Sequence, residues 1–150
     1  MAQSTTNLNN WLRPNRSGQF VQIDDAAAND SDKTITVTAG KVWHVLYAFA
    51  SLASTATVGN RQIQMDVGDG TNVIGQSSAL NVQVASLTEN YHWRPDRNTA
   101  TEDVATEHYM PLPSDWLPAG YTMRFYDSAA IDAAADDLTV RIIALEYDAD

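Results

Sequence analysis

The chain has 150 residues, 44% hydrophobic and 19% charged, which suits one globular domain and leaves too little length for two. It contains no cysteine, which excludes disulfides, thiolate catalysis and metal centres held by cysteine. Nine Lys and Arg against 19 Asp and Glu give a formal net charge of −10, which argues against nucleic acid and anionic membranes as partners, because both attract basic surfaces.

The first 18 residues are rich in Gln, Ser, Thr and Asn and predict an extended N-terminal arm ahead of a domain over residues 19–150. They lack the charged start and apolar stretch of a signal peptide, so we expect synthesis in the cytoplasm. The arm is either a tail without fixed structure or a segment that orders on a neighbouring protein. In the second case its anchors are Trp11, Leu12, Arg13 and Arg16, since interfaces favour tryptophan and arginine.

Alternating apolar and polar residues then predict a series of short β-strands. In chain order, we expect them at 20–23, 34–38, 43–52, 60–67, 80–84, 89–94, 108–110, 121–126 and 138–145. Residues 96–120 are rich in turn-forming residues and hold three of the five prolines. Because no helical segments alternate with the strands, the pattern predicts an all-β antiparallel β-sandwich, a jelly roll of about eight strands.

Two of these predicted strands, at 43–52 and 138–145, are apolar on both faces. A sandwich strand normally has one face in the core and one in solvent. Residues 43–52 carry no charge, and their β-branched and aromatic content favours a strand over the helix that is also possible. The surplus apolar face must be covered by residues 96–120, by the arm or by another subunit. Cover by another subunit predicts a homo-oligomer, a dimer or trimer. This outer face or oligomer interface is expected to include Trp43, Tyr47, Phe49, Ile143 and Leu145.

No pattern predicts catalysis or a bound cofactor. The three histidines lack the spacing of metal ligands, and no serine lies in a nucleophile elbow. Asp127, Asp132, Asp136 and Asp137 gather near an alanine-rich loop, where they either hold calcium or form a solvated acidic loop, the commoner case. We therefore expect a protein that is not an enzyme and that uses neither a metal nor a cofactor.

Carbohydrate binding is an alternative, because aromatic rings provide stacking surfaces for sugars. Tyr91 and Trp93 lie on one predicted strand close to two arginines, and Trp116 lies in the turn-rich passage. A tail or fibre-associated domain that binds host carbohydrate would use these three residues.

Several segments resemble a stretch found in small proteins of tailed bacteriophages. They are Leu112–Gly120, Arg124–Asp132 and Asp136–Val140, with Thr36–Trp43 and Thr57–Arg61 fitting the same pattern. The resemblance spans residues 36 to 147 and implies a structural role in the virion, akin to the jelly-roll decoration or cement proteins that clamp capsid subunits from outside. On this basis we expect a protein on the outer surface of a phage capsid, bound to the major capsid protein and to copies of itself.

Overall fold

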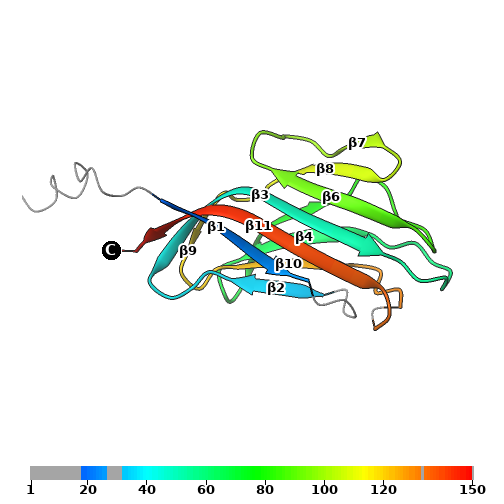
Figure 1. Cartoon of the computed structure of the whole chain (residues 1–150), viewed down its shortest axis with the longest axis horizontal. Coiled ribbons are helices and arrows are strands. Elements are labelled where there is room, and N and C mark those ends of the chain that lie inside the picture. The colour runs from blue at the N-terminus through cyan, green and yellow to red at the C-terminus, as the bar shows by residue number, and fades with distance from the viewer. Residues whose placement is uncertain (1–17, 27–31, 133, 150) are drawn as a thin grey trace, which may run out of the picture.

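The computed structural model describes residues 18–26, 32–132 and 134–149, with the backbone alone at 102–104. Within these ranges all secondary structure is β-strand (Figure 1), so no helix there could span a membrane. Apart from Gly18, the arm predicted over residues 1–18 lies outside the described residues. Its predicted anchors Trp11, Leu12, Arg13 and Arg16 lie outside them too.

The described residues form eleven strands, and eight of the nine predicted strands are among them. The three strands that the sequence pattern missed are β5, β7 and β9. In chain order the strands are β1 (Gln19–Asp25), β2 (Lys33–Thr36), β3 (Lys41–Ala53), β4 (Ile63–Gly68), β5 (Val73–Ser78), β6 (Thr88–Arg94), β7 (Thr101–Val104), β8 (Glu107–Pro111), β9 (Trp116–Pro118), β10 (Thr122–Asp127) and β11 (Asp137–Asp148).

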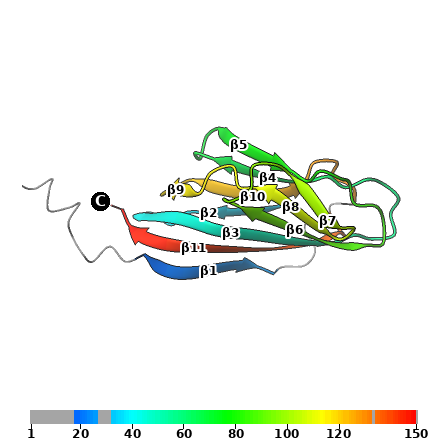
Figure 2. The same cartoon turned by 90° about the horizontal axis from the view of Figure 1, so that it is seen from above.

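The strands form two sheets that lie against each other as two layers (Figure 2). The larger sheet has the order β1-β11-β3-β6-β8-β7 with β9 beside β3, and the smaller has the order β2-β10-β4-β5. Four antiparallel pairs are nested along the chain, namely β1 with β11, β2 with β10, β3 with β6 and β4 with β5. This nesting of eight strands over two sheets is the jelly roll. The predicted fold class is confirmed.

Residues 96–120, which the sequence marks as a long turn-rich passage, extend the larger sheet. Strand β8 pairs with β6 in parallel, β7 pairs with β8, and β9 pairs with the other end of β3. These strands widen the larger sheet. They add to the sheet, and do not form a layer over its outer face.

The core lies between the two layers and is built from alternate side chains of each strand. On β4, Ile63, Met65 and Val67 point inward and are fully buried. Trp93 of the larger sheet meets Phe125 of the smaller edge-on, with ring centroids 5.3 Å apart. Each large side chain buried here contributes about 2 kcal/mol to stability. A chain without cysteine draws its stability from this core.

A β-bulge explains why β3 is apolar on both faces. Tyr47 of β3 pairs with Ile143 of β11, and Val45 pairs with the next residue, Ala144. Leu46 is therefore an extra residue on β3. An extra residue reverses the side-chain alternation. Before the bulge Trp43 and Val45 face the core, and after it the even-numbered positions from Ala48 onward do so. Trp43, predicted on the outer face, is therefore a core residue, only 3% exposed.

The prediction of a strand at residues 80–84 is wrong. Leu80, Val82 and Val84 are exposed, while the polar Gln83 is buried. Gln83 makes a single bridge to Arg61, and its amide side chain donates to the carbonyl oxygens of Leu52 and Leu87. The alternation of apolar and polar residues here therefore did not show which side chains face the core.

Three loops at one end of the sandwich are held together around a buried ion pair. The Arg61 guanidinium donates to both carboxylate oxygens of Asp136, at 2.7 and 3.1 Å, and both side chains are fully buried. Arg61 also donates to the backbone carbonyls of Thr57 and Gly59. This pair joins the β3–β4 connection to the β10–β11 connection, and the Gln83 bridge adds the β5–β6 connection.

Three of the four clustered aspartates make hydrogen bonds within the protein, and Asp136 is the one paired with Arg61. Asp127 accepts hydrogen bonds from the backbone N–H groups of Gln62, Ala129 and Ile131, and Asp132 accepts from the hydroxyls of Thr55 and Thr57. Asp127 and Asp136 are buried, so neither belongs to a solvated loop. Within the described residues no group of acidic and histidine side chains has the arrangement of a metal site.

Replacing Arg61 should be severely destabilising, because it leaves the Asp136 carboxylate buried without its counter-charge. We expect Arg61→Met to lower the free energy of unfolding by about 3 to 5 kcal/mol. The measurement is urea unfolding followed by tryptophan fluorescence. Arg124→Met is the control, since the pair of Arg124 with Asp32 is exposed and such pairs contribute about 1 kcal/mol or less. Equal losses of unfolding free energy in the two variants would contradict the stabilising role given to the buried Arg61–Asp136 pair.

The same ion pair makes stability depend on pH. Burial acts to raise the pKa of Asp136, but hydrogen bonds from Arg61 and Thr55 outweigh it and hold the pKa below its ordinary value of 3.8. The ionised form therefore stabilises the fold, fully so above about pH 4, and this contribution disappears as the pH falls through the folded-state pKa. The difference in unfolding free energy between the natural protein and Asp136→Asn should stay constant above about pH 4 and shrink as the pH falls below it. Asp96→Asn, which removes an exposed carboxylate, is the control.

Candidate interaction surface

The outward side of the larger sheet, called the outer face below, carries aromatic side chains in rows that run across the strands. The register of the pairs defines three of these rows. Because the bulge at Leu46 lies between the first row and the second, all three stay on the same side. The rows are Phe20, Leu145, His44 and Trp116; then Gln22, Ile143 and Tyr47; then Asp24, Arg141, Phe49, His92 and Tyr109.

In the third row, His92 contacts several neighbouring side chains. Its ring stacks on Tyr109 with centroids 4.6 Å apart, and it lies 5.2 Å from the ring of Phe49. The Tyr47 hydroxyl lies 2.5 Å from His92 Nδ1, and a Glu107 carboxylate oxygen lies 2.6 Å from His92 Nε2. Both ring nitrogens are thus engaged, so the imidazole is held in one orientation.

The protonation of these groups follows from their surroundings. Burial raises the pKa of the Tyr47 hydroxyl, so at neutral pH it stays protonated beside His92 Nδ1. Hydrogen bonds from Asn90 and His92 lower the pKa of Glu107, so it remains a carboxylate that accepts from His92 Nε2–H. The Tyr47 hydroxyl and the Glu107 carboxylate thus hold the two ring nitrogens of His92 from opposite sides. A tyrosine with a raised pKa is a poor nucleophile, and the arrangement positions rings more readily than it activates one.

A second set of stacked rings, called the tryptophan platform below, consists of His44, Trp116 and Tyr147. His44 and Trp116 are nearly parallel, with centroids 4.4 Å apart and 3° between planes, and Tyr147 lies 5.7 Å from Trp116. Trp116 is nonetheless 51% exposed. Gly18 lies against this platform, since a Cβ there would come within 2.6 Å of the Tyr147 ring. Gly18, the last residue of the predicted arm, therefore lies beside Tyr147.

Between these groups the outer face is apolar. Ile143 and Leu145 of β11 are half-buried, while Phe20, opposite Leu145 on the edge strand β1, is 61% exposed. Four of the five residues predicted for an outer apolar face thus lie on it, namely Tyr47, Phe49, Ile143 and Leu145. Sequence reasoning missed Phe20, His92 and Tyr109, because they become neighbours only through strand pairing.

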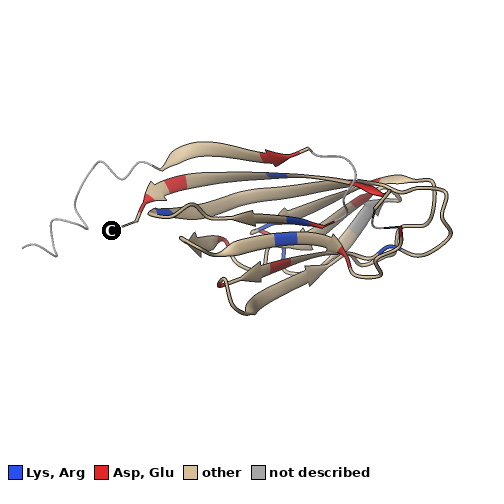
Figure 3. Cartoon of the chain, turned by 90° about the horizontal axis from the view of Figure 1, so that it is seen from below, with Lys and Arg blue, Asp and Glu red and all other residues tan. Residues whose placement is uncertain are grey.

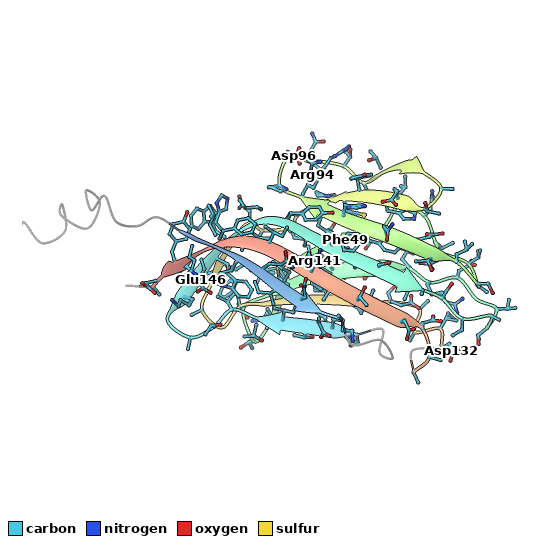
Figure 4. The ribbon with its side chains drawn as sticks, in the orientation of Figure 1. Phe49, Arg94, Asp96, Asp132, Arg141 and Glu146 are labelled. Carbon is cyan, nitrogen blue, oxygen red and sulfur yellow. The ribbon has the colours of Figure 1, made fainter. Side chains whose placement is uncertain are left out.

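Ion pairs border the outer face. Arg141 donates to Asp24 at 2.6 Å, and this hydrogen bond lowers the pKa of the exposed Asp24. The two residues line a shallow hollow of about 220 Å³ together with Phe49, whose position beside Arg141 is visible in Figure 4. At the far edge Arg94 pairs with Asp96, also labelled there. The charges on this face are largely paired with each other, which leaves the rings as its dominant feature.

Two of the three residues predicted for sugar stacking are in the core. Tyr91 and Trp93 alternate with His92 on β6 and point between the sheets, where both are fully buried. Tyr91 also donates to Gln83 and stacks on the buried His108. Burial excludes Tyr91 and Trp93 as a platform for a ligand in this structure. Only Trp116 of the predicted three is exposed.

The sequence matches no protein-family model and no curated protein. Among solved structures, one described as "Structure of PfGH50B" aligns with 89% of this chain at 13% identity and a TM-score of 0.37, and the alignment spans 23% of that protein. A chain described as turnip yellow mosaic virus aligns with 91% of this chain and 84% of its own length, at 8% identity and a TM-score of 0.35. Likenesses this weak carry no argument about function, and the jelly roll assigned above rests on the strand pairing alone.

Proposed function

We propose that the protein is a structural subunit of a bacteriophage virion, a decoration or cement protein on the outside of the head that binds the major capsid protein. The observation that carries the proposal is the outer face, with its held aromatic rings and largely paired charges. The resemblance of five sequence segments to small tailed-phage proteins supports the same role. The fold adds nothing to it, because jelly rolls serve many functions.

Held aromatic rings suit a protein–protein contact. Such side chains are enriched at interface cores because they cover a large area with little loss of side-chain freedom. Stacking and hydrogen bonds already hold His92 and Trp116, so docking requires little further ordering there. Each large apolar side chain that a partner covers contributes about 2 kcal/mol. Phe20 and Trp116, both more than half exposed, offer the largest gains on this face.

In this proposal the N-terminal arm extends the contact. Gly18, the last residue of the arm, lies beside the tryptophan platform, next to the outer face. Trp11 and Leu12 then supply apolar anchors to the capsid, and Arg13 and Arg16 supply donors for its carboxylates. The acidic domain, with a net charge of −10 over the whole chain, would be steered toward a basic region of the shell.

The outer face is tested by removing its most exposed ring. Phe20→Ser should weaken binding to shells assembled from the virus's own major capsid protein by about 30-fold, since covering a large apolar side chain contributes about 2 kcal/mol. Co-sedimentation over a range of protein concentrations measures it. Val58→Ser is the matched control, because Val58 is also exposed but lies in the β3–β4 connection, away from the outer face. Unchanged binding by Phe20→Ser would exclude this face as the contact.

The arm is tested separately by deleting residues 1–18. We expect the shortened protein to keep its circular-dichroism spectrum and its unfolding transition but to lose shell binding, since the anchors go with the arm. Full binding by the shortened protein would show that the arm has no part in the contact.

A second candidate function is the binding of host carbohydrate by a tail or fibre-associated domain, and the exposed Trp116 favours it. Its ring stacks on His44 on one side, and Asp115 lies 3.5 Å from His44 Nε2, so a carboxylate lies near a flat ring. This reading predicts binding on a glycan array that Trp116→Ala abolishes. A cement protein should give no glycan signal with either form.

A further inference from the structure

Strand β5 forms an open edge of the smaller sheet. Among the described residues it pairs with β4 alone, and no other strand lies on its second side. The backbone groups on that side are available to another strand, which makes an edge of this kind a template for pairing between chains.

The other edge strands each carry a feature that opposes such pairing, whereas β5 has none. Charged residues, proline and short length are the devices that protect edges. Strand β5 contains no charged residue and no proline, and it is drawn free of charge at the border of its sheet in Figure 3. The protected edges are β1 with Asp24 and Asp25, β2 with Lys33, β7, which has only four residues, and β9, which has three residues and ends at Pro118.

Exposed apolar side chains run along this edge and past its end. Val73 and Ile74 are 61% and 51% exposed at the start of β5, and Leu80 is 60% exposed beyond it. The chain after β5 stays alongside β4, because Ala79 N–H donates to the Ile63 carbonyl and Gln83 bridges to Arg61. No residue from Gly70 to Thr88 is charged. The open edge with residues 79–84 is called the neutral edge below.

We propose that the neutral edge binds a second copy of this chain, with the β5 strands of the two copies pairing antiparallel about a twofold axis. Two molecules of charge −10 repel each other, and contact is least opposed where neither carries charge. A basic partner would instead favour the carboxylates of β1.

A twofold arrangement also matches the apolar side chains. Antiparallel pairing brings the start of β5 in one copy toward the end of β5 in the other, so Val73 and Ile74 face the Leu80 region of the second copy. The edge from Val73 to Val84 is roughly 40 Å long if extended, at about 3.3 Å per residue. Pairing there joins two smaller sheets into one continuous sheet and leaves both outer faces uncovered. The dimer contact is independent of the proposed function. Only its role, which is to present two outer faces to a shell, rests on that function.

Sedimentation velocity of the full chain tests the proposal. We expect a concentration-dependent monomer–dimer equilibrium, and Ile74→Lys and Leu80→Lys should each raise the dissociation constant about 30-fold or more, because they place charge in a buried pairing edge. Thr36→Lys is the matched control: it adds the same charge to an exposed position on β2, the opposite edge of the same sheet, and should dimerise normally. Circular dichroism checks that each variant is folded.

Hydrogen exchange shows where the copies meet. Amide protons of residues 73–78 should exchange more slowly at concentrations where the dimer forms than where it dissociates, and those of β2 should not change. A chain that stays monomeric overturns the proposal, as does a dimer that both lysine variants preserve or that forms without protecting β5. These measurements involve no capsid, so they can fail while shell binding stands, or succeed while shell binding fails.

Discussion

The rest of the structure depends on the antiparallel pairing of β3 with β11 and on the extra residue Leu46 within it. These strands are the longest of the fold and lie near the middle of the larger sheet. A strand that alternates without interruption would send Trp43 and Val45 to one side and Ala48, Ala50 and Leu52 to the other. The bulge lets all five enter the core, which frees Tyr47 and Phe49 for the outer face. The double-sided apolar pattern thus reflects a change of phase along one strand.

The molecule has two surfaces that differ in charge and therefore in the partners they suit. The outer face combines held aromatic rings with ion pairs at its border, an arrangement that suits a partner of different chemistry. The neutral edge offers backbone groups and aliphatic side chains without charge, and suits a molecule identical to itself. The surfaces lie on different sheets, so occupation of one does not require the other to be free. Jelly-roll pairing produces this separation, because it leaves the outer side of one sheet and an edge of the other open at once.

Several of the wrong predictions share one cause, since alternation shows that neighbouring side chains point in opposite directions without showing which direction is inward. Tyr91 and Trp93 alternate with His92, and pairing of β6 with β3 and β8 turned the two larger rings to the core. Leu80, Val82 and Val84 alternate with Gln83, and there the polar residue is buried because its amide meets the carbonyls of Leu52 and Leu87. The four clustered aspartates suggested solvent or calcium. Arg61, far away in sequence, takes the most buried of them as its partner.

What the sequence by itself determined was the class of the structure: strands in number, without helices or cysteine, and apolar residues in excess of what one core face requires. Periodicity and composition are local properties, and local reasoning reaches them. Tertiary structure alone decided which strands became neighbours, where β3 changes phase, which rings stack on the outer face and which edge lacks charge. Each of these depends on residues distant along the chain, such as Phe20 beside Leu145 or Arg61 beside Asp136. The pairing register between such segments is set by their combined packing, so it cannot be predicted from any one segment alone.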